Sequence, residues 1–251
     1  MIGKRNMLLV IDIGNTNINF GLFKGKRLAK KFVIPTALYC LKELKIKLGV
    51  FKAQDVVICS VVPKVTVVLK KDLFRLSGRL PYIIGKDLIV PLKNLYRNPK
   101  QVGQDRLVNA YAAVMLYKAP LIVVDFGTAV TFDLISKHRE YLGGMILPGL
   151  VISLDTLAQR TALLPKVKLD KPKEFIGRDT KTSMLSGIVY GFAALTDDLA
   201  QRIKDKIGRQ ARLIATGGNI ALMARYCKSI DKIDRDLTLK GLSFIYEGFK
   251  R

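Results

Sequence analysis

The chain has 251 residues, 49% of them hydrophobic, so it can bury a large core and does not belong to the intrinsically disordered class. It lacks an uncharged apolar run of about 18 residues, so we expect no membrane span. The 43 Lys and Arg against 20 Asp and Glu give a formal net charge of +23. These basic residues are scattered in short runs that are typical of solvated surfaces, so we do not expect nucleic acid to be the main partner.

The N-terminus combines a basic start with a short apolar run, MIGKRNMLLVIDIG, but lacks the small-residue cleavage site of a secretion signal. We therefore expect a cytoplasmic protein. Three widely spaced cysteines, Cys40, Cys59 and Cys227, fit neither a disulfide framework nor a zinc site, and we expect them to be buried or half-buried. His138 lies in the polar run SKHRE and is expected in a solvated loop.

Apolar runs separated by turn residues predict three strands at the start of the chain. These are LLVIDI, INFGLF and RLAKKFVI, with FKGKR as the hairpin between the last two. A helix is expected over residues 38–49, with Leu41, Leu44 and Leu48 on one face. DVVICSVV then predicts a strand, VTVVLKKDLFRLSG a helix and PYIIG a short strand.

The second half repeats this order. LIVVDFG, VTFDLIS and REYLGGMI predict three strands, followed by helices over residues 149–163 and 182–206. RLIATGG is a later strand, and NIALMARYC opens a helix. This recurrence predicts a duplicated α/β architecture with a boundary near residue 115.

Two turns, DIGNTN and DFGTAVT, each place a carboxylate at the end of an apolar strand. The carboxylate can coordinate Mg²⁺, and the glycine lets a phosphate approach the backbone. Asn and Thr add hydrogen-bond donors for phosphate oxygens. Two facing turns of this kind could hold a polyphosphate and its cation; the alternative is two ordinary hairpin turns.

Two further segments suggest a binding site. ATGGN, residues 215–219, joins a strand to a helix, so its amides suit an anion and its glycines a flat ring, although a simple connecting turn is the alternative. YRNPKQVGQDRLVNAYAA, residues 96–113, places Asp105 at a helix start. This residue is either a helix cap or a general base beside the anion-binding Arg106. The P-loop pattern G-x-x-x-x-G-K-S/T is absent, which excludes a P-loop kinase, and no G-x-G-x-x-G follows a strand.

In this order, DIGNTNINFGLF, Tyr96 with NPKQVGQDR, DFGTAVTFD, GGMILPGL and ATGGN resemble the type III pantothenate kinases. ALLPKVKL and IGRDTKTSMLSGIVYG also match, so the resemblance runs nearly end to end. It implies an α/β fold of duplicated ribonuclease-H-like, actin-like ATPase domains with an ATP cleft between them. Residues 1–115 would hold the first phosphate motif and the substrate loop, and residues 116–251 the second phosphate motif and the adenosine motif.

The resemblance implies phosphorylation of pantothenate by ATP, the first step of coenzyme A biosynthesis, in a homodimer with Mg²⁺ and a monovalent cation, K⁺ or NH₄⁺. Asp105 would be the catalytic base, and Asp179 would add a negative charge where the family often carries Asn. The other substrate-binding residues would be Tyr96, Gly103, Gln104, Arg106 and, from the partner subunit, Thr180. The nucleotide would be bound by Asp12, Ile13, Gly14, Asn15, Thr16, Asn17, Ile18, Asn19, Thr128, Gly217 and Gly218, with Asp12 near the Mg²⁺ and Asp125 as the monovalent-cation ligand.

Two alternatives remain open from the sequence. One is another kinase of the same superfamily that acts on a sugar or an acid. The other is a non-catalytic transcriptional accessory factor on the same fold, against which the intact carboxylates of Asp12, Asp105 and Asp125 argue.

Overall fold

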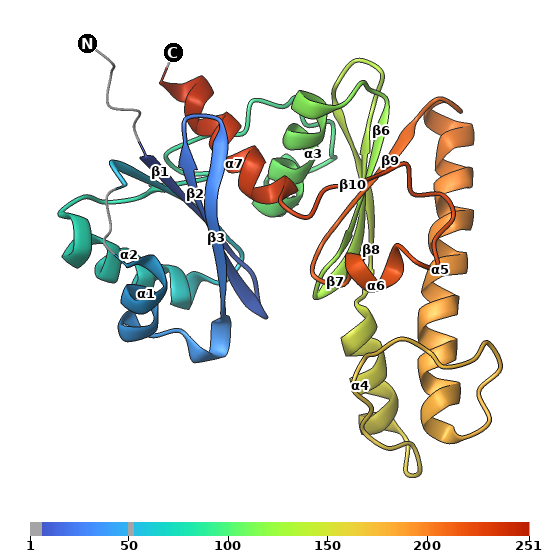
Figure 1. Cartoon of the computed structure of the whole chain (residues 1–251). Helices are drawn as coiled ribbons and strands as arrows, with labels where there is room; N and C mark the ends of the chain where they lie inside the picture. Colours follow the sequence, from blue (N-terminus) through green and yellow to red (C-terminus); the bar gives the residue numbers. More distant parts are fainter. Residues whose placement is uncertain (1–6, 50–52, 251) are drawn as a thin grey trace. The chain divides into compact units, whose positions relative to one another are not determined.

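A computed structural model describes residues 7–49 and 53–250 (Figure 1). The chain divides into two compact units. Unit 1 comprises Met1–Leu92, Arg97–Met115 and Asp236–Arg251, and unit 2 comprises Lys93–Tyr96 and Leu116–Arg235. Each unit contains a five-stranded mixed sheet.

The sheet of unit 1 has the strand order β3-β2-β1-β4-β5. Strand β1 pairs antiparallel with β2 and parallel with β4. The elements of this unit are β1 (Met7–Ile13), β2 (Asn17–Lys24), β3 (Arg27–Pro35), η1 (Thr36–Leu38), α1 (Leu41–Leu48), β4 (Asp55–Ser60), α2 (Pro63–Ser77), β5 (Tyr82–Ile83), η2 (Pro99–Gln101), α3 (Gln104–Leu116) and α7 (Leu237–Phe249). The strands and helices that the sequence predicts before residue 85 are confirmed, whereas α7 was not predicted.

The two faces of this sheet are covered by different helices because successive side chains of β1 point to opposite sides. Leu9, Ile11 and Ile13 pack in one cluster with residues of α1 and α2. Val10 belongs to the other face, where helix α7 contacts β1, β2 and β4. Asp12, two residues after Val10, therefore lies on the α7 face of the sheet.

Helix α7 is joined to the first residue of β4 by a polar cluster. The Asp55 carboxylate accepts hydrogen bonds from the Tyr246 hydroxyl and from Lys250 Nζ, the latter at 2.8 Å. Lys250 Nζ also lies 4.9 Å from the centre of the Tyr246 ring. Partial burial opposes ionisation, but the bonds from Lys250 and Tyr246 outweigh it and lower the pKa of Asp55.

We expect Asp55→Asn to lower the free energy of unfolding by about 1–2 kcal/mol at pH 7, because it removes a charge-assisted hydrogen bond. The folded-state pKa of Asp55 is lowered, so its stabilisation is present above the unfolded-state pKa and is lost as the pH falls through the folded-state value. Urea unfolding should therefore show a smaller difference between variant and wild type at pH 3 than at pH 7. A difference that is independent of pH would contradict this origin.

Unit 2 repeats the topology of unit 1, with the strand order β10-β9-β6-β7-β8. Its central strand β6 pairs antiparallel with β7 and parallel with β9, as β1 does with β2 and β4. The elements are β6 (Leu121–Phe126), β7 (Ala129–Ile135), β8 (Tyr141–Pro148), α4 (Leu150–Arg160), α5 (Thr180–Ile207), β9 (Arg212–Thr216), α6 (Ile220–Met223) and β10 (Lys232–Ile233). The predicted duplication of strand order is confirmed, but the helix expected in NIALMARYC is only the short α6.

One hydrophobic cluster of unit 2 lies on the face of its sheet that packs against α5. Ile122, Val124 and Phe126 of β6 pack with Val189 and Ala193 of the long helix α5. Asp125 falls between Val124 and Phe126, so its side chain belongs to the opposite face. Each central strand thus ends with a carboxylate on the face away from its main helical cluster.

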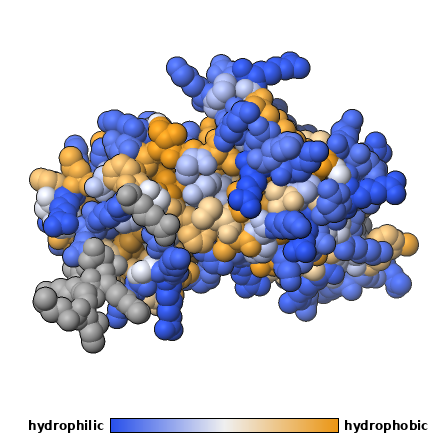
Figure 2. Space-filling view, turned by 90° about the horizontal axis from the view of Figure 1, so that it is seen from above, coloured by the Kyte–Doolittle hydropathy of each residue, from blue (hydrophilic) through white to orange (hydrophobic). Residues whose placement is uncertain are grey.

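The exposure of polar side chains, of His138 and of two of the three cysteines agrees with the expectations from the sequence. Hydrophilic side chains project over much of the face in Figure 2, with apolar residues between them. His138 is exposed in a turn, as expected, and Cys59 and Cys227 are buried. Cys40 is exposed, so the expectation that it is buried or half-buried was wrong: it lies just before α1, outside the apolar stripe. None of the helices within the described residues is long and apolar enough to cross a membrane.

Candidate active site

The first predicted phosphate motif forms a tight turn between β1 and β2. Gly14 N donates to Asn17 O at 2.9 Å, which closes the turn. Thr36 braces it from η1: its hydroxyl donates to Gly14 O at 2.7 Å and its amide donates to Thr16 O at 2.9 Å. Asn15, Thr16 and Asn17 are exposed, so their polar groups can reach a ligand.

Asp12 lies at the base of this turn beside two other ionisable groups. Its Oδ2 accepts a hydrogen bond of 3.1 Å from the Asn19 amide across the β1–β2 pair. Burial and the nearby charge of Asp105 raise the pKa of Asp12 to about 7, against the lowering effect of Asn19. Cys59 is the parallel partner of Asp12 on β4, and burial next to these carboxylates raises the pKa of its thiol well above the usual value. Asp12 and Asp105, separated widely in sequence, therefore interact electrostatically.

Asp105 lies in the first turn of α3. Its Oδ1 accepts a 2.9 Å hydrogen bond from Arg106 N, and a Cβ on Gly103 would lie 2.5 Å from the same oxygen. Gly103 O in turn accepts from Arg106 N and Leu107 N, at 3.1 and 3.3 Å. Burial raises the pKa of Asp105, although the Arg106 amide and guanidinium oppose it. This carboxylate contacts its own helix start, as a cap does, but its raised pKa also suits a general base.

The second phosphate motif and the ATGGN segment meet around Asp125. A Cβ on Gly127 would lie 3.2 Å from Asp125 Oδ1, and one on Gly217 would lie 2.4 Å from it. Gly217 has φ of +98°, and Asn219 N donates to Phe126 O at 3.0 Å. A side chain at position 217 would fill the space beside the carboxylate, so glycine is required there. Thr128 is exposed on the adjoining turn.

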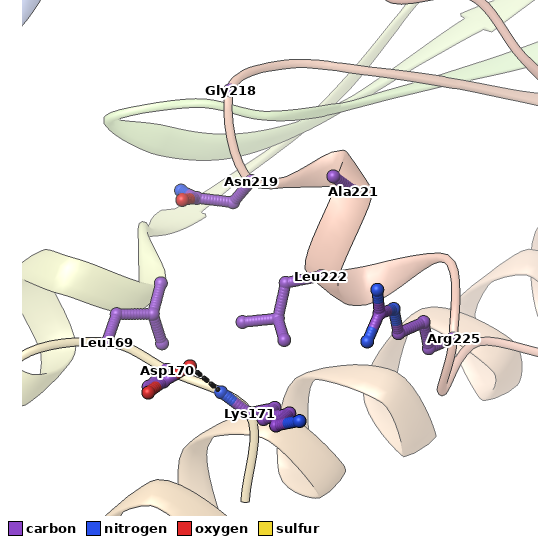
Figure 3. Close-up of a pocket in the computed structure, with 8 residues that line it drawn as sticks. All are labelled: Leu169, Asp170, Lys171, Gly218, Asn219, Ala221, Leu222 and Arg225. Atoms are coloured by element: carbon purple, nitrogen blue, oxygen red, sulfur yellow. Dashed lines mark hydrogen bonds between the residues drawn. The ribbon is translucent and has the colours of Figure 1, made fainter.

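A pocket of about 330 Å³ opens next to this junction (Figure 3). Leu222 of α6 and Leu169 of the segment before α5 lie on two sides of it, with Gly218 at its edge. Asp170 Oδ1 accepts from Lys171 N at 2.7 Å, which shapes the same segment. The remaining lining residues are Asn219, Ala221 and Arg225. The lining is mixed: Leu169, Ala221 and Leu222 offer apolar surface to a flat ring, and the other side chains are polar or charged.

Tyr96, the aromatic residue predicted to line the substrate site, belongs to unit 2. Its amide donates to Asn94 Oδ1 at 2.9 Å, and its ring lies 6.5 Å from the ring of Tyr141. The Tyr141 hydroxyl donates to the buried Asp133 at 2.7 Å. The half-buried ring of Tyr96 therefore lies near the buried pair of Tyr141 and Asp133, a neighbourhood that the sequence did not reveal.

Thr180 is exposed at the first position of α5, and Asp179 is the N-cap of this helix. Asp179 Oδ1 accepts from Thr182 N at 2.8 Å, and Thr182 Oγ1 accepts from Asp179 N at 3.1 Å. The bond from the Thr182 amide lowers the pKa of Asp179. Asp and Asn cap helices equally well, so the charge at this position is compatible with a capping role alone.

We expect Asp179→Ala to lower the urea midpoint of unfolding, because the first turn of α5 loses its cap, while Asp179→Asn retains a midpoint close to that of the wild type. The matched pair separates the cap from the charge. An equal loss in both variants would show that the charge matters more than the hydrogen bond.

The donor set for a divalent cation is sparse. Residues 7–49 and 53–250 contain no group of three or more His, Cys, Asp and Glu side chains arranged to hold a metal. Mg²⁺ commonly uses one or two carboxylates and completes its shell with phosphates and water, which Asp12 can support. A cation would also offset the burial cost that raises the pKa of Asp12.

Comparisons with known proteins agree with this geometry. A family model for type III pantothenate kinase matches residues 8–202. The type III pantothenate kinase of Geobacter sulfurreducens is 41% identical over 251 residues, covering 96% of this chain and 98% of the relative. That of Brevibacillus brevis is 40% identical with the same coverage, 96% and 98%. The solved structure of a glucokinase from an Antarctic psychrotroph has a TM-score of 0.52 at 12% identity, covering 96% of this chain and 99% of that one.

The repeated sheet, with a carboxylate near the end of each central strand, gives this chain the same overall fold as that glucokinase. The sequence similarity to these kinases covers 96% of the chain. The chain belongs to the type III pantothenate kinase family.

Sequence reasoning missed three contributors to the site's surroundings. Cys59 becomes a neighbour of Asp12 through the parallel pairing of β1 and β4. Tyr141 supports Tyr96 through a contact between distant segments. Helix α7 could have been found from the helical spacing of its apolar residues Leu239, Leu242 and Tyr246.

Proposed function

We propose that this chain transfers the γ-phosphoryl group of ATP to pantothenate, forming 4'-phosphopantothenate in the first step of coenzyme A biosynthesis. The main support for this substrate is membership of the family, which rests on a sequence match over 96% of the chain. The observation that supports the chemistry is Asp105, a largely buried carboxylate with a raised pKa at the start of α3. Family membership does not favour a transcriptional accessory role.

In this proposal Asp105 accepts the proton of the pantothenate hydroxyl as its oxygen attacks the phosphorus. Gly103, Gln104, Arg106 and Tyr96 bind pantothenate, and the guanidinium of Arg106 adds a positive charge beside the carboxylate. Phosphoryl transfer depends mainly on positioning and charge neutralisation, which a base and backbone donors can supply. Mg²⁺, when bound near Asp12, neutralises phosphate charge.

The nucleotide would lie along the two turns. Asp12, Ile13, Gly14, Asn15, Thr16, Asn17, Ile18, Asn19 and Thr128 would bind its phosphates, and Gly217 and Gly218 its adenine. The pocket at Gly218 supports the adenine site, because Leu169 and Leu222 give it apolar surface among polar and charged side chains. Asp125 would hold K⁺ or NH₄⁺.

The proposal also includes the domain boundary and the assembly. We place the main boundary between residues 115 and 116, although Lys93–Tyr96 belong to unit 2 and Asp236–Arg251 belong to unit 1. We also propose a homodimer in which Thr180 reaches pantothenate bound to the partner. The exposed position of Thr180 at a helix start supports this, because its hydroxyl and amide are available to an anionic ligand.

A coupled ADP-release assay tests the reaction. With ATP and Mg²⁺ we expect ADP to appear only when pantothenate is added, and more rapidly with K⁺ than with Na⁺. A panel of sugars and small hydroxy acids serves as the control for the related kinase chemistry. Transfer to one of these acceptors and not to pantothenate would reject the proposal; equal rates with K⁺ and Na⁺ would reject only the cation role of Asp125. Sedimentation velocity tests the dimer.

A further inference from the structure

Residues 83–88, which follow β5, form a closed turn. The amides of Lys86, Asp87 and Leu88 all donate to Ile83 O, at 3.2, 2.8 and 3.2 Å. Gly85 N donates to Leu88 O at 2.7 Å, and the Asp87 carboxylate accepts from Ile83 N at 2.9 Å. The backbone of this turn is therefore fixed by its own hydrogen bonds.

The turn is also docked against the sheet that carries Asp12. Ile84 N donates to Ile58 O of β4 at 2.9 Å, which continues the β4–β5 pairing by one residue. Ile84 and Leu88 are 4% and 2% exposed, so both anchor the turn in the core. Ile58 directly precedes Cys59, the strand partner of Asp12. The turn is thus a rigid extension of the site-bearing sheet.

The side chain of Gln104 lies directly on the backbone of Gly85. A Cβ at position 85 would lie 2.7 Å from Gln104 Cδ, 2.9 Å from Oε1 and 3.0 Å from Cγ. Gly85 also has φ of +81°, which residues with a Cβ rarely adopt. Because glycine has no Cβ, the space beside residue 85 is free for the side-chain amide of Gln104.

Gln104 is the first residue of α3 and directly precedes Asp105. Its amide can both donate to and accept from the hydroxyl and amide groups of pantothenate. We propose that Gly85 is a positioning residue for pantothenate binding: the turn 83–88 is a backbone platform that holds the Gln104 amide toward the substrate. This inference rests on the proposed function.

The test is Gly85→Ala, compared with Gly78→Ala as the matched control. Gly78 also has positive φ, +69°, but a Cβ there would meet nothing within 4 Å. Both variants carry backbone strain, while only Gly85→Ala displaces the Gln104 amide, and it does so cheaply because the contact is with the end of a flexible side chain. We expect KM for pantothenate to rise about three- to tenfold in Gly85→Ala, with kcat and KM for ATP within about twofold. Gly78→Ala should retain all three wild-type values.

A double-mutant cycle shows whether the effect passes through Gln104. Gln104→Ala should raise KM for pantothenate, and adding Gly85→Ala to it should cause no further rise. An unchanged KM in Gly85→Ala, an equal rise in Gly78→Ala, or a full additional rise in the double variant would each overturn the inference. The activity of the wild type distinguishes failure of the proposed function from failure of this inference. If the wild type does not phosphorylate pantothenate, both are rejected. If the wild type is active and any of those three results is found, only the inference is rejected.

Discussion

Asp105→Asn is expected to lower kcat by about 10²- to 10⁴-fold, the usual contribution of a general base. Asparagine has nearly the same shape and its side-chain oxygen can still accept the hydrogen bond from Arg106 N, so the start of α3 should remain intact. What it loses is the ability to take a proton from the pantothenate hydroxyl. Steady-state kinetics with pantothenate and ATP measure the effect.

Asp198→Asn is a suitable control because Asp198 is a carboxylate on the exposed side of α5 that pairs with Arg202. It should keep wild-type turnover. Circular dichroism and urea unfolding should show that Asp105→Asn folds normally. If the folded variant keeps wild-type kcat, Asp105 is not the base and its raised pKa reflects burial alone.

Asp12→Asn is expected to stabilise the metal-free protein while abolishing most of its activity. An ordinary Asp ionises near pH 3.8, whereas burial raises the pKa of Asp12 to about 7. Between these values the unfolded chain has released a proton that the folded chain keeps, so this group destabilises the fold progressively as the pH rises. Such a shift corresponds to about 4 kcal/mol above pH 7. Partial exposure of the residue reduces the expected gain on neutralisation to about 1–3 kcal/mol.

Urea unfolding in EDTA at pH 4 and pH 8 measures this gain. The variant and the wild type should have similar stability at pH 4 and should differ at pH 8, with the variant more stable. Turnover with Mg²⁺ should fall roughly 100-fold or more, because a carboxylate near the metal is lost. If the variant and the wild type were equally stable at pH 8, the charge of Asp12 would be well solvated. If turnover with Mg²⁺ were unchanged, Asp12 would not belong to the metal site.

The parts of the fold that sequence reasoning predicted are those with strong local patterns. The apolar run of β1 ends at a glycine turn, and β6 repeats the pattern, so both central strands and their terminal carboxylates could be placed before the structure was known. Because the same order of strands recurs in the second half, the duplicated topology could also be predicted. Local period and turn chemistry are properties of neighbouring residues, which is why they can be read directly.

The missing parts depend on contacts between distant segments. Gly85 and Gln104 meet across an irregular connection that has no period, and Asp55 meets Lys250 across a sequence separation of 195 residues. The interaction of Asp12 with Asp105 likewise follows from packing and not from spacing. The cap at Asp179 is different: its pattern was visible in RDTKT, but the sequence alone did not show that the carboxylate is used by the helix.

The packing of α7 on the sheet of unit 1 has a consequence for the order in which the two units fold during synthesis. A ribosome synthesises residues 7–92 first, yet their sheet is completed by α7 only after all of unit 2 has been translated. Most of unit 2 is continuous in sequence and can fold as soon as it emerges, whereas the unit with Asp12 and Asp105 must wait with one sheet face uncovered. Unit 2 is therefore expected to acquire its native fold before unit 1, although the synthesis of unit 1 begins first.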